Sequence, residues 1–565
     1  MKFSELPYKR PALDPIDEKY ASLPAQMEAA ENLETLLSLL KEFEAFVSEV
    51  MTMYNLSYIR HTVDTRDAFY EQENAYYDAC LPYFEQLRNE ICRALTASPF
   101  RRELERELGP AFFRNAELSM RAFAPEIIPD LAEENRLMSS YQQLMASARI
   151  PFQGQILTFP QLSPFKESPD AAVRKAAFTA EGTFLQEHGD ELDRIFSQLI
   201  QLRTKMAKAL GFQSFTDMAY CRRTRSCYGR EDVAAFREQV IRHVVPLSSR
   251  LIEKQHKRNG ISDAHVWDRT FLFPSGNPAP ADPPEIIFRK GKQMYSELSG
   301  ETKEFFDFML KGDLFDVLSK DGKANGGYCT ELPAFKAPFV FANFDGTSGD
   351  IEVLTHECGH AFESYRAMRS MKHIFQCEYT MDIAEIHSMG MEVLTYPWMP
   401  LFFGKDADKF YYSHLSEALR FLPYGCMVDH FQHIVYDHPE LTSAQRHDAW
   451  LNLERLYRPD INYDGIPYYD KGGWWQRQLH IYMHPFYYID YCLAQSAALM
   501  FWQAAQQDRS DAWTRYLSLV NKAGTLPFTE LMRSAGFQSP MEDGVIKSLA
   551  DSVFAYLEQM DDSHF

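Results

Sequence analysis

Hydrophobic residues recur at three- and four-residue steps over most of the chain. In the stretch from 191 to 212, apolar residues stand at positions 192, 195, 196, 199, 206 and 210. This spacing places them on one face of an α-helix, and Gly211 is typical of a helix end. Residues 31–54 and 168–192 follow the same pattern. The periodicity therefore predicts a mostly helical protein.

Strand patterns are few. Residues 153–163 and 337–344 are short runs of β-branched or aromatic residues, which favour strands. Residues 274–285 contain five prolines, too many for a helix or a sheet, so this stretch is predicted to be a linker. Helical patterning resumes after Pro284. We expect a small sheet within a helical protein.

A polar motif, HECGH, occupies residues 356–360. The preceding residues predict a strand end, a turn and a helix that begins near Thr347 or Ser348. Apolar residues at 351, 354, 358, 361, 362 and 365 gather on one face of this helix. His356 and His360 fall roughly opposite that face. One side of the helix should therefore pack into the core, and the other should present two imidazoles.

Two histidines one turn apart can bind the same Zn²⁺. Glu357 lies next to them, where it can take a proton from water on the metal without being a ligand itself. The same letters also arise by chance on solvated helices. A third ligand is needed to decide between the two interpretations.

A second helix is predicted within residues 380–398, between a threonine that can cap it and a terminating proline. Glu385 and Glu392 share one of its faces because they are seven residues apart. Glu385 follows His360 by 25 residues, an interval that suits a helix, a loop and a returning helix. Two histidines and one carboxylate leave Zn²⁺ an open position for water. Glu392 is expected to accept a hydrogen bond from an imidazole, although either glutamate alone is also typical of a solvated helix.

The third notable stretch is rich in histidine and tyrosine. Within residues 480–491 it contains His480, Tyr482, His484, Tyr487, Tyr488 and Tyr491. Such side chains can donate hydrogen bonds to the oxyanion that forms when water attacks a peptide carbonyl. His480, Tyr488 and Tyr491 are the candidates, with His484 and Tyr487 in reserve. An aromatic core segment would have a similar composition.

Composition narrows the class of protein. The 565 residues carry a net charge of −21, which argues against nucleic-acid binding and mildly favours basic peptides. Neither a secretory signal nor an apolar run of about 18 residues is apparent, so no membrane partner is expected. Nine scattered cysteines without a CxxC pair indicate reduced thiols and a cytoplasmic location.

Three features occur together in this order along the chain: HECGH, Glu385 placed 25 residues after His360, and the His/Tyr block of residues 480–491. In this the chain resembles the thimet oligopeptidase and oligoendopeptidase F family of zinc metallopeptidases, and most of all its bacterial Pz-peptidases. The resemblance implies one Zn²⁺ per chain. It implies that the metal ligands are His356, His360 and Glu385 and that the general base is Glu357. It also implies that a histidine and tyrosines of residues 480–491 stabilise the transition state, for which His480, Tyr488 and Tyr491 are the candidates.

The resemblance also implies a fold. We expect a mostly α, two-lobed helical ellipsoid with a deep central channel and a small β-sheet beside the zinc site. An N-terminal helical lobe over residues 1–190 and a catalytic region over residues 191–565 are expected, with interwoven lobes. Residues 337–344 would be the strand edge against which a peptide backbone pairs.

The function expected from these features is zinc-dependent endoproteolysis of short unstructured oligopeptides. The sequence does not determine the oligomeric state, and a monomer is favoured. A dipeptide-releasing zinc carboxypeptidase of related fold is an alternative. A non-catalytic peptide-binding protein is another, against which Glu357 argues because a binder needs no base beside the metal.

Overall fold

The computed structural model describes residues 2–13, 15–320, 322–324, 326–563 and 565, and most of them are helical. The chain divides into two compact units, each assembled from three segments. The first unit comprises Met1–Met120, Pro278–Phe410 and Ala497–Gln538, and the second Arg121–Asn277, Tyr411–Ser496 and Ser539–Phe565. The lobe boundary expected at residue 190 stays a prediction.

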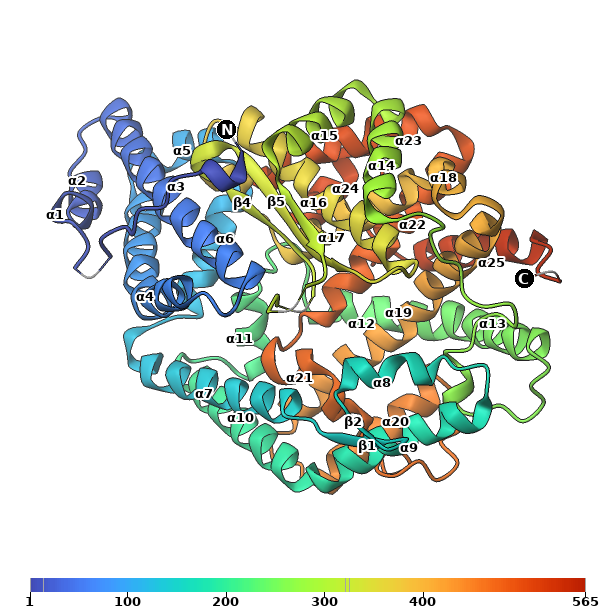
Figure 1. Cartoon of the computed structure of the whole chain (residues 1–565). Helices are drawn as coiled ribbons and strands as arrows, with labels where there is room; N and C mark the ends of the chain where they lie inside the picture. Colours follow the sequence, from blue (N-terminus) through green and yellow to red (C-terminus); the bar gives the residue numbers. More distant parts are fainter. Residues whose placement is uncertain (1, 14, 321, 325, 564) are drawn as a thin grey trace. The chain divides into compact units, whose positions relative to one another are not determined.

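Helices form most of both units, and Figure 1 labels them in chain order. They are α1 (Glu18–Ala21), α2 (Leu23–Glu28), α3 (Leu33–Val63), α4 (Ala68–Ala97), α5 (Arg101–Leu108), α6 (Pro110–Arg121), α7 (Ile128–Ala146), α8 (Phe159–Lys166), α9 (Ala171–Glu187), α10 (Gly189–Ala209), α11 (Phe215–Arg222), α12 (Arg230–Gln239), α13 (Val245–Arg258), α14 (Pro284–Leu298), α15 (Gly300–Gly312), α16 (Gly349–Ser370), α17 (Met381–Leu394), α18 (Met399–Phe403), α19 (Ala407–Asp437), α20 (Ser443–Tyr457), α21 (Leu479–Met483), α22 (Tyr488–Gln507), α23 (Arg509–Val520), α24 (Phe528–Ser534) and α25 (Val545–Gln559).

The helical periodicity is confirmed, with local adjustments. The stretch 31–54 lies within α3, whereas 168–192 is divided between α9 and α10 at His188. Helix α10 ends at Ala209, and Gly211 has a φ of +79°, a left-handed conformation that glycine adopts at little cost. The strong apolar period of α10 buries Leu192, Ile195, Phe196, Leu199 and Met206.

One expected strand is divided between a short strand and the start of a helix. Within 153–163, only Gln155–Leu157 form a strand (β2), paired antiparallel with β1 (Ile150–Phe152). From Phe159 the chain enters α8, because Thr158 begins the helix and its backbone N–H donates to the Gln161 side chain at 3.0 Å. This capping contact outweighs the strand preference of the preceding residues.

The first unit contains a three-stranded sheet in the order β3-β5-β4. The expected strand 337–344 is confirmed as β5 (Ala337–Phe344), but it is the central strand. It pairs in parallel with β3 (Phe315–Leu318) and antiparallel with β4 (Tyr328–Leu332). Both sides of β5 are therefore occupied, and the expectation that it offers a free edge to a peptide is wrong.

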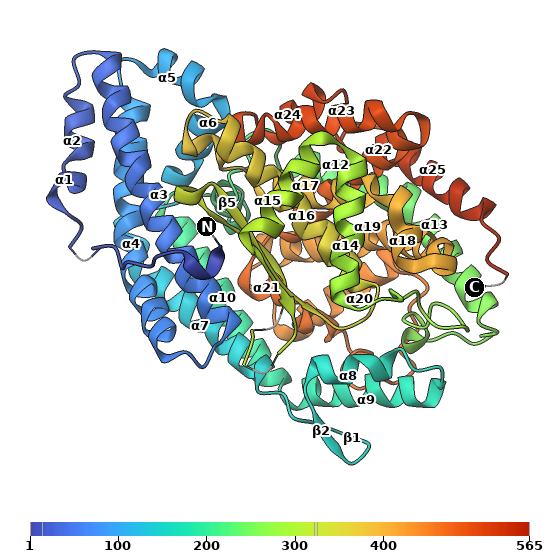
Figure 2. The ribbon, with the colours of Figure 1, turned by 45° about the horizontal axis from the view of Figure 1, so that its top comes forward.

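Helices α16 and α17 pack against each other, and α16 also packs on β5 (Figure 2). The predicted apolar face of α16 is confirmed. Its members are almost completely buried: Ile351, Leu354, Cys358, Ala361, Phe362 and Tyr365. Within the described part of the chain, none of the helices combines the length and apolar character that a membrane crossing requires.

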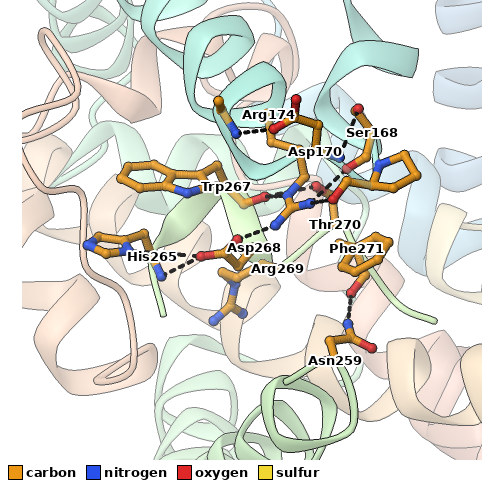
Figure 3. Close-up of polar contacts among 12 residues, drawn as sticks. Ser168, Asp170, Arg174, Asn259, His265, Trp267, Asp268, Arg269, Thr270 and Phe271 are labelled. Atoms are coloured by element: carbon orange, nitrogen blue, oxygen red, sulfur yellow. Dashed lines mark hydrogen bonds and ion pairs between the residues drawn. The ribbon is translucent and has the colours of Figure 1, made fainter. Parts of the chain in front are cut away.

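In the second unit, Arg174 of α9 fastens the irregular segment that precedes the proline-rich stretch. Its buried guanidinium pairs with the Asp268 carboxylate and donates to the carbonyl oxygens of Trp267, at 3.1 Å, and Ser168, at 2.7 Å (Figure 3). One side chain thereby satisfies these two backbone acceptors, of which the Trp267 carbonyl is buried. The predicted linker is irregular up to α14, which begins at Pro284.

Candidate metal centre

The HECGH motif lies in the middle of α16, in the first unit. The start of this helix is held by Asp350, whose carboxylate accepts hydrogen bonds from the backbone N–H groups of Asp345 and Gly346 at 2.8 and 2.9 Å. A carboxylate in the first turn also suits the helix dipole. Ser348 is the N-cap residue, as one of the two expected, but its side chain makes no capping hydrogen bond. The helix therefore begins where the sequence predicted, for a partly different reason.

Three candidate ligands converge although they come from two helices. The Oε2 atom of Glu385, on α17, lies 3.4 Å from Nε2 of His356 and 3.7 Å from Nε2 of His360. One donor atom from each of the three side chains lies within 4.8 Å of the other two. Two imidazoles and a carboxylate at this spacing are a donor set that suits Zn²⁺ and leaves a position open.

Two neighbours orient these donors. Oε1 of Glu392 lies 2.6 Å from Nδ1 of His356, so the opposite ring nitrogen is turned toward Glu385. The hydroxyl of Ser388 donates to Oε2 of Glu385 at 3.0 Å. Such supporting contacts are typical of metal sites. The role of Glu392 as an acceptor was predicted, whereas that of Ser388 was missed because nothing in the sequence marks it.

Gly359, the variable position of the motif before His360, explains how α17 approaches so closely. A Cβ at this position would lie 2.4 Å from the backbone oxygen of His387 and 2.7 Å from Cα of Ser388. Because only glycine lacks a Cβ, the two helix backbones can touch here. The sequence analysis made no prediction for Gly359, and its packing role is visible only in the structure.

Glu357 is buried beside the candidate ligands. Its Oε2 atom has no hydrogen-bond partner among the described residues. Burial, with the nearby carboxylates of Glu385 and Glu392, raises the pKa of Glu357 to about 7, although the charge of His356 opposes the shift. A carboxylate with a pKa near neutrality is matched to taking up and releasing a proton.

The two histidines differ electrostatically. Burial opposes the charged form of His356, but its contacts with Glu385 and Glu392 prevail and raise the pKa of His356 well above its ordinary value. Burial and the charge of His356 lower the pKa of His360 to about 4. A dication in this position would favour both imidazoles in their neutral form, because ligation requires a free nitrogen lone pair.

The His/Tyr block lies in the second unit, on α21, the turn after it and the start of α22. Ring centroids of His480 lie 4.9 Å from those of Tyr488 and 5.9 Å from those of Tyr491. Tyr488 and Tyr491 are 5.7 Å apart, so they share a side of α22 as predicted. Of the reserve residues, Tyr487 is buried and His484 exposed. The three candidates form one cluster, and their relation to the metal ligands stays a prediction.

Tyr424 and Gln478, which the sequence did not identify, determine which ring nitrogen of His480 carries the proton. Tyr424 donates to Oε1 of Gln478 at 2.7 Å, which leaves the amide nitrogen of Gln478 to face Nδ1 of His480 at 2.8 Å. Burial, together with the charges of His484 and Arg223, lowers the pKa of His480 to about 4. His480 is therefore neutral near pH 7, and its proton is on Nε2.

The chain matches known proteins both through family models and through individual relatives. The model of the family described as Peptidase family M3 matches residues 164–275 and 302–551, and that of the Peptidase M3 N-terminal domain matches residues 3–123. Among curated proteins, the chain is 22% identical to Oligopeptidase PepF of Bacillus subtilis (strain 168) over 66% of its length. It is also 22% identical to an oligoendopeptidase F homolog of Lactococcus lactis subsp. lactis (strain IL1403), over 68%. These matches span 55% and 63% of the two relatives.

Solved structures match over the whole chain. Pz peptidase A with inhibitor 2 is 45% identical, with a TM-score of 0.93 and complete coverage of both chains. The oligoendopeptidase-F of Enterococcus faecium, at 17% identity and a TM-score of 0.62, covers 96% of this chain and 98% of its own, and shows the fold alone. The family model spans more than half of the sequence and includes every candidate residue of the metal centre. The chain therefore belongs to peptidase family M3.

Proposed function

We propose that this protein is a zinc-dependent endopeptidase that hydrolyses internal bonds of short, unstructured oligopeptides. The observation that carries the proposal is the convergence of His356, His360 and Glu385 beside the buried carboxylate of Glu357. A metal-binding protein without catalysis has no need of a base held next to its ligands. Membership of peptidase family M3 supports the same reaction.

One Zn²⁺ per chain would be held by Nε2 of both histidines and the carboxylate of Glu385. Zinc supplies, when bound, a Lewis acid that activates water and polarises a carbonyl. The residues of the chain orient these donors: Glu392 turns the ring of His356, and Ser388 holds the carboxylate of Glu385. The carboxylate of Glu357 has an oxygen without a hydrogen-bond partner among the described residues, which supports its role as the base.

Glu357 would take the proton of the attacking water and later transfer it to the amine that leaves. Burial raises the pKa of Glu357 above that of a carboxylate in water, which makes it a stronger proton acceptor.

His480, Tyr488 and Tyr491 would donate hydrogen bonds to the oxyanion. The neutral His480, with its proton on Nε2, is a donor even though it carries no charge. Donors of this kind act most strongly when negative charge has developed on the carbonyl oxygen. Their action on the oxyanion is part of the proposal.

The peptide backbone would pair with β4, the edge strand of the sheet. The N–H of Val340 donates to the Leu314 carbonyl on the β3 side at 3.0 Å, so the opposite residue, Cys329, directs its N–H and C=O to the outer edge of β4. Further along this edge, the Glu331 carbonyl already accepts from Asn55. The segment near Cys329 is therefore the part of the edge that we assign to the peptide.

The remaining expectations are a deep channel that excludes folded proteins, a monomeric state and a cytoplasmic location. The carboxypeptidase alternative differs in one requirement, a free substrate carboxylate at the cleaved end. A fluorogenic peptide blocked at both ends separates the two, because only an endopeptidase cuts it.

The test of the metal centre compares the parent with His360→Ala. Metal content by elemental analysis and cleavage of the blocked peptide should both fall to background in the variant. Chelation of the parent should abolish cleavage, and added Zn²⁺ should restore it. A variant that retains one zinc per chain would show that the ligand assignment is wrong.

A further inference from the structure

Three arginines, Arg222, Arg223 and Arg225, stand close together in the sequence at the C-terminal end of α11 in the second unit. Two of them have carboxylate partners. Arg222 bonds Glu134 at 3.0 Å, and Arg225 bonds Asp490 at 2.6 Å. Arg223 alone of the three forms no ion pair with any described residue.

Arg223 is nevertheless held in place. Its Nε–H donates to the carbonyl oxygen of Pro485 at 3.3 Å, and its guanidinium lies 4.9 Å from the ring centroid of Tyr487. The side chain is half-buried, and burial lowers the pKa of Arg223. A cation that is partly desolvated and fixed but not neutralised is costly to keep, which is unexpected in a chain with a net charge of −21.

The position of this cation links it to the His/Tyr block. Pro485 and Tyr487 belong to the turn between α21 and α22, the helices that carry His480 and Tyr488. The positive charge of Arg223 contributes, after burial, to lowering the pKa of both His480 and His484. Its unused N–H groups therefore lie at the edge of the cluster that we assign to catalysis.

We propose that Arg223 binds a carboxylate of the peptide substrate, either its C-terminus or an Asp or Glu side chain. A guanidinium donates two parallel hydrogen bonds to a carboxylate, and Arg223 has both terminal nitrogens available for this. The proposal rests on the proposed peptidase function, because it takes the ligand to be a peptide. It adds a preference for acidic groups that the metal centre alone does not provide.

The test measures binding, so that it does not depend on turnover. Three peptides are titrated calorimetrically into zinc-loaded protein carrying Glu357→Gln: acetyl-tetraalanine with a free C-terminus, its C-terminal amide, and the amide with one alanine replaced by glutamate. At least one acidic peptide should bind about 10- to 100-fold more tightly than the neutral amide, the range expected for hydrogen bonds to a charged group. The peptide that gains affinity identifies the source of the carboxylate.

Adding Arg223→Gln should remove this preference, whereas Arg223→Lys should retain part of it. Arg242→Gln is the matched control, since it removes one positive charge from an exposed position of the same unit and should leave the preference unchanged. Equal binding of the three peptides, absence of binding, or a preference that survives Arg223→Gln would overturn the proposal. If the zinc-loaded parent does not cleave peptides but the carboxylate preference is observed, only the proposed function is contradicted.

Discussion

Nδ1 of His356, on α16, lies 2.6 Å from Oε1 of Glu392, on α17. This contact leaves Nε2 as the ring nitrogen that faces Glu385, so it determines which atom of His356 is available to a metal. We expect Glu392→Gln to weaken zinc binding by roughly 10- to 100-fold, because loss of such a partner removes the orientation and basicity of the ligand. Competition with a chelator measures the affinity. Glu352→Gln on α16 is the control and should bind zinc like the parent.

Replacing Glu357 with Gln should separate catalysis from metal binding. The amide has the same size but cannot accept a proton, so kcat should fall by at least ~10²-fold while zinc remains at one per chain. Elemental analysis and peptide cleavage are measured on the same preparation. Near-parental cleavage by the zinc-loaded variant would rule out Glu357 as the base.

Tyr488→Phe and Tyr491→Phe test the oxyanion donors. Each variant should lower kcat by about 10²–10³-fold with little change in KM, because the hydrogen bond is strongest in the transition state. The control is Tyr482→Phe, whose hydroxyl is buried and donates to the Leu192 carbonyl at 3.3 Å. That variant should affect melting temperature more than rate. Parental rates in both test variants would identify the block as structural.

Gly359→Ala should destabilise the contact between α16 and α17. Since the new Cβ would lie 2.4 Å from the His387 carbonyl oxygen, the helices must separate, at a cost of about 1–3 kcal/mol in the free energy of unfolding. Zinc affinity should fall as well, because Glu385 moves with α17. Gly300→Ala in α15 is the control, as its Cβ would meet nothing within 4 Å. Equal denaturation midpoints for the two variants would refute the packing role of Gly359.

His433, on α19, should make stability depend on pH. Burial lowers the pKa of His433 to about 4; the charges of Arg237 and Arg230 act in the same direction, whereas those of Asp429 and Asp437 oppose the shift. The unfolded chain, with an ordinary pKa of about 6.5, binds the proton first as pH falls.

The free energy of unfolding should therefore decrease as pH falls from about 6.5 to about 4, by up to ~1.4 kcal/mol per pH unit for this group. Denaturant unfolding at a series of pH values measures the slope, which should be shallower in His433→Gln than in the parent. His438→Gln replaces a histidine that is exposed and should keep the parental slope. Identical slopes in all three proteins would contradict the assignment.

The sequence by itself determined the helices and the candidate chemistry on them. The apolar period of α16 predicted which face is buried, because residues on a helix are neighbours at fixed local spacing. The same local rule placed Tyr488 and Tyr491 on one side of α22. The intervals within HECGH and from His360 to Glu385 identified the three donors that the structure brings together.

Only the tertiary structure decided relationships between distant segments. That β5 is a central strand follows from the pairing of β3 and β4 on its two sides, and no pattern within residues 337–344 contains that information. The roles of Ser388, Gln478 and Gly359 likewise arise from contacts or orientation across packed elements. Local spacing depends on backbone geometry alone, whereas the approach of α17 to α16 depends on the packing of both helices and on the missing side chain of Gly359.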